Sequence, residues 1–161
     1  MTTETVMPRL SPHLVCDGAA AAIDFYKQAF GAEEVMRLPG PSGKLMHASV
    51  TINGAMVLLV DEMPEYGVLG PAKLGGTAVT LHLVVPDVDA AFARAIDAGA
   101  TETMAVADQF WGDRYGVLKD PFGHSWSLAT PKPDAPQTEA ELQEAAKGVF
   151  DAPEDAACRN Q

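Results

Sequence analysis

The sequence predicts an α+β protein of two pseudo-symmetric β-α-β-β-β units whose curved sheets surround a cleft, plus a C-terminal helix. Three observations support this fold class. The tripeptide His-Leu-Val at 13–15 recurs at 82–84, which is 69 residues further along. A helix pattern that stops at a glycine follows each copy. The turn pair Asn53-Gly54 is matched by Phe122-Gly123 at the same offset, so one unit is present twice.

The first unit is expected over residues 8–61. An apolar run at 9–16 forms its first strand, and a helix follows over 18–30, with Asp17 as N-cap and Gly31 as the stop. Strands over 33–38, 45–52 and 55–61 complete the unit. The last two are joined by Asn53-Gly54, a strong signal for a two-residue hairpin. The helix stripe consists of Ala19, Ile23, Tyr26 and Phe30.

The second unit is expected over residues 77–130, after a linker at 62–76 that is rich in glycine and proline. Its first strand covers 78–85. Asp87 then caps a helix that begins at Val88 and stops at Gly99. Strands follow at 101–107, 116–119 and 125–129, the last two around the turn at 120–123. Residues 110–115 are aromatic, polar and glycine-containing, a composition typical of a recognition loop.

The tail over residues 131–161 has a different composition. Thr138 and Glu141 have the spacing of a capping box, which predicts a short helix at about 138–149. Its apolar stripe could pack on its own subunit or on a partner. The stripe consists of Leu142, Ala145, Ala146, Val149 and Phe150.

Composition and charge narrow the function classes. The chain has 161 residues, 47% of them hydrophobic, which suits one domain with a real core. Its 22 acidic and 11 basic residues give a net charge of −11, which disfavours nucleic acid and anionic lipid as partners. The two cysteines indicate neither a disulfide framework nor a thiolate metal site. A signal peptide or membrane span is not evident, so a soluble cytoplasmic protein is expected.

Three stretches carry a resemblance to a known family: CDGAAAAIDFYKQAFGAEE, LMHASVTING and QFWGDRYGVLKDPFGHSWSLAT. Together they resemble the vicinal oxygen chelate superfamily, which includes glyoxalase I, bleomycin-resistance proteins and extradiol dioxygenases. The PhnB-like branch is the most similar. The resemblance covers about residues 8–130. It implies the paired-unit fold and a homodimer.

The resemblance also has consequences for metal binding. Metal-dependent members place a His on the first strand and a carboxylate on the last strand of each unit. Here those positions hold Ser11, Leu58, Thr80 and Ser127. Divalent transition metals prefer imidazole nitrogen or anionic oxygen, so the usual metal site is absent by resemblance and no cofactor is predicted.

Three histidines are candidate site residues. His13 and His82 each lie two residues after a position where relatives hold a ligand, and residues i and i+2 of a strand point to the same face. Both should face the cleft, and His47 could join them. They could line a ligand pocket, bind an atypical metal or make structural hydrogen bonds. The opposite parity is apolar and should face the helices: Leu14, Cys16, Leu81, Leu83, Val85, Trp126 and Leu128.

Six further residues are candidate contacts. Arg114 could pair with an anionic ligand, or form an ion pair with Asp113 or Asp120. Asp61 and Glu62 end a strand near the cleft rim and could serve as a base or orient His47, or simply be solvated. Aromatic walls or dimer contacts could come from Phe110, Trp111 and Tyr115.

Two function classes remain open, and whether the protein is an enzyme stays undecided. The first is a metal-free module that binds a small, partly aromatic or anionic molecule. The second is a lyase, isomerase or dioxygenase-type enzyme that acts on a small carbonyl or aromatic compound. It would use the clustered histidines as acid-base groups or as ligands of an atypical metal.

Overall fold

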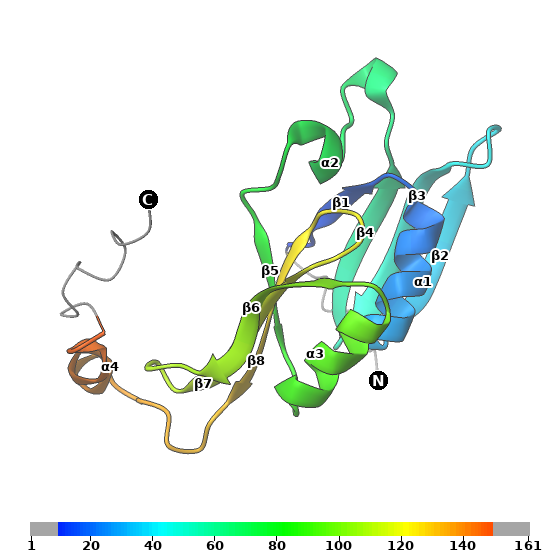
Figure 1. Ribbon diagram of the computed structural model, residues 1–161. Coiled ribbons are helices and arrows are strands. Elements are labelled where there is room, and N and C mark those ends of the chain that lie inside the picture. Colours follow the sequence, from blue (N-terminus) through cyan, green and yellow to red (C-terminus); the bar gives the residue numbers. More distant parts are fainter. Residues whose placement is uncertain (1–9, 150–161) are drawn as a thin grey trace, which may run out of the picture.

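The computed structural model describes residues 10–149, so the start of the first predicted strand, Cys158 and the end of the tail lie outside it. Two four-stranded mixed sheets form, in the strand orders β1-β4-β3-β2 and β5-β8-β7-β6 (Figure 1). The α+β fold of paired units is therefore confirmed. The elements are β1 (His13–Cys16), α1 (Ala19–Phe30), β2 (Glu33–Pro39), β3 (Leu45–Ile52), β4 (Ala55–Asp61), η1 (Pro64–Tyr66), α2 (Pro71–Leu74), β5 (Thr80–Val84), α3 (Val88–Asp97), β6 (Thr101–Asp108), β7 (Asp113–Lys119), β8 (Ser125–Pro131) and α4 (Glu139–Ala146).

The core lies where α1 and α3 cover one face of each sheet and contact each other. The predicted stripe of α1 is buried, and its Phe30 packs against Trp126 of β8 with ring centroids 4.6 Å apart. Trp126 and Leu128 face this core, as the strand parity predicted. The helix-covered sides therefore join the two units, and the opposite face of each sheet stays open.

Each unit also caps the first strand of the other. The Val15 carbonyl, on β1, accepts a hydrogen bond from Nε2 of His124 at 2.9 Å. The equivalent carbonyl of β5, on Val84, accepts one from Nδ2 of Asn53 at 2.9 Å. Both donors lie in or beside the last hairpin turn of the other unit. The recurring His-Leu-Val strands and tight turns thus meet in two nearly equivalent contacts.

The N-terminus of α1 corrects the sequence prediction. Asp17 does not cap the helix; the N-cap is Gly18, at φ 101°, with no cap from its own segment. Oδ1 of Asp61, at the end of β4, accepts instead from the Gly18 and Ala19 N–H groups at 3.0 and 2.9 Å. The predicted cap of α3 is confirmed, because the Asp87 side chain accepts from the Ala90 N–H.

The linker holds more structure than its composition indicates, whereas the helix of the tail was predicted. The linker contains η1 and α2, and its Gly70 lies against the buried Glu62. The capping box of Thr138 and Glu141 is present and starts α4. None of the residues of α4 is buried, and the helix lies apart from both sheets (Figure 1).

Candidate functional site

The open face of the first sheet brings two of the predicted histidines together. His13 on β1 and His47 on β3 have ring centroids 6.0 Å apart. Leu58 of β4 lies opposite His13 in the strand register. At the edge of the same face, Met36 and Leu38 of β2 are 47% and 52% exposed. The face therefore combines imidazole edges with apolar side chains open to a ligand or partner.

The open face of the second sheet carries a continuous aromatic row. His82 of β5 stacks on Tyr115 of β7, with ring centroids 6.2 Å apart. Trp111 meets Tyr115 edge-on at 5.3 Å, and Phe110 meets Trp111 at 5.2 Å. Nδ1 of His82 lies 2.8 Å from the Ser127 hydroxyl. The row offers flat apolar surfaces with a polar imidazole and hydroxyl at one end.

The aromatic row also has hydroxyl neighbours that the sequence analysis did not propose as site residues. The hydroxyls of Thr80 and Ser125 lie 3.2 Å apart. These residues come two positions before His82 and Ser127 on the same strands. The signal was available, because these residues share the strand parity of His82. Thr80 had been considered only as a poor metal ligand, and Ser125 had not been considered. Together they form a polar stripe beside the aromatic row.

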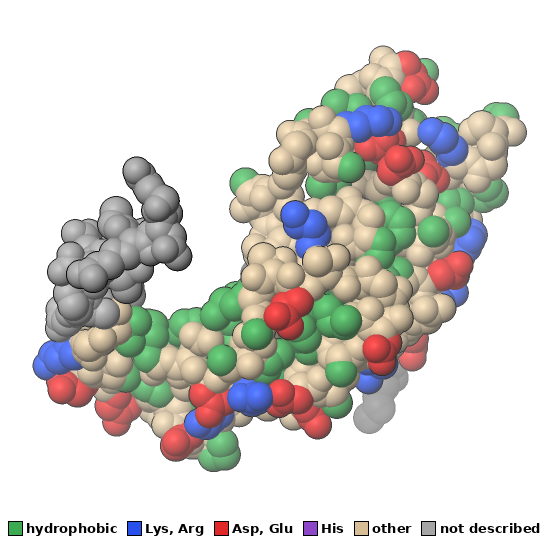
Figure 2. All heavy atoms as spheres, viewed as in Figure 1, with side chains coloured by type: hydrophobic (Ala, Val, Ile, Leu, Met, Phe, Trp, Pro, Cys, Tyr) green, Lys and Arg blue, Asp and Glu red, His purple; other side chains and the backbone are tan. Residues whose placement is uncertain are grey.

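The two open faces do not meet within one chain. The sheets join through α1 and α3, and within the described residues no strand of one pairs with a strand of the other. His82 contacts its own sheet rather than His13 or His47. Figure 2 shows a bent molecule with hydrophobic side chains gathered over the arm of β6, β7 and β8. His13 and His82 therefore do not face each other across a cleft inside a single subunit.

The donor set on these faces does not fit a divalent metal. The two residues beside the histidines, Leu58 and Ser127, supply an alkyl group and a neutral hydroxyl. In the described part of the chain no group of three His, Cys, Asp or Glu side chains is placed to hold an ion.

Arg114 does not lie in the predicted recognition loop, and this corrects its expected role. β7 already begins at Asp113, so Arg114 and Tyr115 point to opposite faces of a strand. The guanidinium contacts Oδ1 of Asp89 on α3 at 2.7 Å and Oδ1 of Asp108 at 3.1 Å. Its charge is matched on the helix side, with different partners from the predicted Asp113 and Asp120.

Asp61 and Glu62 are buried rather than solvated. Asp61 is 6% exposed and accepts three backbone N–H bonds, from Gly18, Ala19 and Leu45. Glu62 is 2% exposed and accepts from the Gly70 N–H at 2.8 Å and from the Lys73 ammonium. Both carboxylates hold backbone segments in place, so neither serves His47 as an orienting group or base.

Cys16 is also unsuited to catalysis. It is fully buried in the core. Burial, and then the nearby Asp120 carboxylate, raise the pKa of the thiol to about 12. A thiol in this environment stays protonated at neutral pH and is a poor nucleophile.

Glu62 predicts a pH-dependent anchor for the linker. The Lys73 ammonium, followed by the Gly70 N–H, holds the pKa of the Glu62 carboxyl below its usual value. Because the pKa is lower in the folded state, the ionised carboxyl stabilises the contact fully when the pH is above the unfolded-state pKa. This stabilisation is lost as the pH falls through the folded-state pKa. We expect hydrogen exchange of the Gly70 amide, corrected for its intrinsic rate, to accelerate on acidification to about pH 3. In the Glu62→Gln variant the Gly70 amide should exchange faster at neutral pH, and its exchange should no longer depend on pH in this way. The same pH dependence in both proteins would contradict the anchor.

The comparison with known proteins decides the family. The family model of the Glyoxalase/Bleomycin resistance protein/Dioxygenase superfamily matches residues 7–128. The chain belongs to this superfamily. The protein Mb0911c of Mycobacterium bovis is 59% identical over 129 residues, which cover 78% of this chain and 85% of the relative. The resemblance noted from the three sequence stretches is thereby confirmed.

Solved structures agree with this assignment. The crystallised product of Arabidopsis thaliana gene At5g48480 is 30% identical, with a TM-score of 0.62 over 77% of this chain and 99% of its own. The PhnB protein from Bacillus cereus is 21% identical, with a TM-score of 0.61 over 76% and 99%, and supports the fold alone. No helix within residues 10–149 is long and apolar enough to cross a membrane.

Proposed function

We propose that this superfamily member binds a small, partly aromatic molecule on the open face of its second sheet, without the usual divalent metal. The observation that carries the proposal is the aromatic row of Phe110, Trp111, Tyr115 and His82 beside the Ser127 hydroxyl. A flat ligand can stack on the row while its polar edge bonds to imidazole or hydroxyl.

The geometry narrows the class of ligand. An anionic ligand was expected because of Arg114. Its guanidinium, however, is paired with Asp89 and Asp108 on the other side of the sheet. The groups near the row are hydroxyls, an imidazole and the Asp113 carboxylate, which accepts from the Trp111 indole N–H and would repel an anion. We therefore propose an uncharged aromatic compound that has a hydroxyl or carbonyl group, rather than an anion.

We further propose that the site is completed in a homodimer. Large apolar side chains are exposed on both open faces, and such surfaces mark interaction sites in soluble proteins. They are Met36 and Leu38 on the first face and Val84 and Met104 on the second. A second copy could place its first sheet opposite the second sheet of this chain. Light scattering that gives only the monomer mass at micromolar concentration would contradict this part.

Tryptophan fluorescence tests the ligand proposal. The chain has two tryptophans: Trp126 is 3% exposed in the core, and Trp111 is half-buried on the open face. We expect titration with 1-naphthol to quench Trp111, and Trp111→Phe to lose most of the quenching. Trp111→Ala should weaken affinity about tenfold, because a stacked aromatic pair contributes about 0.5–1.5 kcal/mol beyond its area.

A matched control and a metal assay complete the test. Tyr66 of η1 is 78% exposed and lies outside the row, so Tyr66→Ala should leave affinity unchanged. Equal losses in Tyr66→Ala and Trp111→Ala would contradict a site on the row. Stoichiometric Zn, Mn, Fe or Ni in protein purified without chelators would contradict the metal-free part and favour the enzyme alternative.

A further inference from the structure

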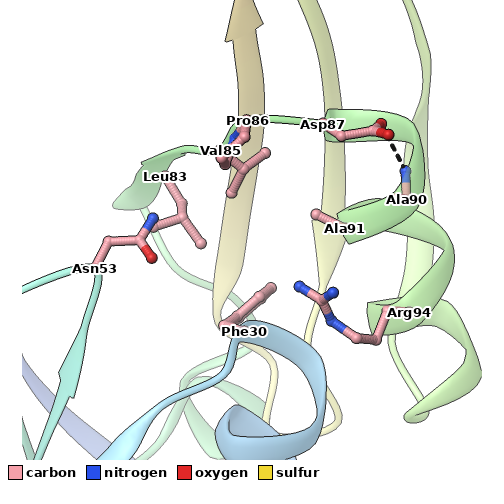
Figure 3. A pocket seen from close by; sticks show the side chains of 9 residues that line it. All are labelled: Phe30, Asn53, Leu83, Val85, Pro86, Asp87, Ala90, Ala91 and Arg94. Carbon is pink, nitrogen blue, oxygen red and sulfur yellow. Dashed lines mark hydrogen bonds between the residues drawn. The ribbon is translucent and has the colours of Figure 1, made fainter.

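A cavity of about 200 Å³ lies between the two units, away from both open faces. Three parts of the chain build it. Asn53 comes from the turn between β3 and β4, Phe30 comes from the end of α1, and the remaining lining belongs to β5, α3 and the segment between them (Figure 3). Its lining includes the apolar side chains of Leu83 and Val85, both 9% exposed.

Arg94 is the only cation among the nine residues that line this cavity. Its Nε donates to the Ala29 carbonyl in the last turn of α1 at 3.0 Å, which fixes the plane of the guanidinium. Among residues 10–149 no hydrogen bond or ion pair engages the two terminal nitrogens. Figure 3 shows the guanidinium turned from α3 toward Phe30, over the cavity. The Nε atom thus has a structural role, and the two terminal nitrogens of the guanidinium are available to a ligand.

The other polar groups of the cavity are already engaged. Nδ2 of Asn53 donates to the Val84 carbonyl, and Oδ1 of Asp87 accepts from the Ala90 N–H. Asp87 is the only anion in the lining. It lies seven positions before Arg94 on α3, about 10 Å away along the helix axis. A carboxylate bound at Arg94 would therefore be separated from the Asp87 charge.

We infer that this cavity binds a small monocarboxylate with a flat or branched apolar body, of about the size of benzoate. The two terminal nitrogens of an anchored guanidinium suit both oxygens of a carboxylate. The body would lie against Phe30, Leu83 and Val85. In a chain with a net charge of −11, this fork would make the cavity selective for an anion, whereas the aromatic row is proposed to take an uncharged ligand.

Chemical-shift mapping with benzoate tests the inference on the full-length, ¹⁵N-labelled protein. We expect shifts at the backbone amides of Ala90 and Ala91 and at the Asn53 side-chain amide, and none from benzyl alcohol at equal concentration. Arg94→Ala should weaken benzoate binding about tenfold or more, since hydrogen bonds to charged groups contribute about 1.5–3 kcal/mol. Arg37→Ala removes an exposed, ion-paired arginine of the first sheet and should change nothing.

A second variant covers the case in which Arg94→Ala loosens the contact between α1 and α3. Ala90 is exposed at the cavity mouth, so Ala90→Phe should fill the cavity while Arg94 and the core stay intact. It should abolish benzoate shifts without a change in thermal stability. Shifts confined to the Trp111 and Tyr115 amides, equal binding of benzyl alcohol, or full binding by Ala90→Phe would each overturn the inference. None of these outcomes depends on whether 1-naphthol quenches Trp111.

Discussion

Replacing Asp120 by Ala is expected to lower the free energy of unfolding by about 4 kcal/mol or more, because each buried donor left without an acceptor costs about 1–3 kcal/mol. Asp120 is 3% exposed. Its Oδ2 accepts from the Tyr26 hydroxyl at 2.7 Å and from the Trp126 indole N–H at 2.9 Å. Its Oδ1 accepts from the Phe122 and His124 N–H groups. One carboxylate thereby ties α1 of the first unit to the last hairpin of the second.

The Tyr26 hydroxyl can donate over the whole working pH range. Burial, followed by the Asp120 charge, raises the pKa of Tyr26 well above its usual value. Tyr26→Phe removes one of four donors and keeps the carboxylate, so it should cost only about 1–2 kcal/mol. Urea denaturation followed by circular dichroism measures both variants.

Asp113 provides the matched control for this experiment. It accepts from the Trp111 indole N–H on the open face and is half-buried rather than buried. Asp113→Ala should cost less than about 1 kcal/mol. A loss in Asp120→Ala no larger than that in Asp113→Ala would show that the buried contact does not hold the units together.

Local patterns accounted for most of the fold. The hairpin at Asn53-Gly54 forms with Asn53 at φ 48°, and β3 and β4 have the predicted bounds, because turn chemistry and strand alternation act between near neighbours. The repeat at an offset of 69 predicted the second unit in the same way. The capping box of Thr138 and Glu141 is equally local.

The errors came from partners that lie far apart in the sequence. The acceptor at the start of α1 is 43 positions away from Gly18, so no window around the helix reveals it. Arg114 was placed in a loop because glycine and aromatic residues surround it, but β7 begins three residues earlier than predicted, which places Arg114 on the helix side. The side chains were recognised, but which face they reach depends on where a strand begins.

Asp61 gives the second large effect. Asp61→Ala is expected to lower the free energy of unfolding by about 2–4 kcal/mol, since loss of a helix cap costs about 0.5–2 kcal/mol and a further buried N–H is left unpaired. That third N–H belongs to Leu45, which Oδ2 of Asp61 binds at 2.7 Å. The carboxylate therefore links the start of α1 to the start of β3.

Asp17 provides the matched control, because it was the predicted cap of the same helix. Asp17 is exposed and precedes the helix, so Asp17→Ala should change the unfolding free energy by less than about 0.5 kcal/mol. Asp61→Asn keeps one acceptor oxygen but turns an amide toward an N–H group, so its loss should lie between those of the two Ala variants. If Asp17→Ala proves as costly as Asp61→Ala, the local cap is the real one. If Asp61→Ala instead weakens 1-naphthol binding at unchanged stability, Asp61 belongs to the ligand site after all.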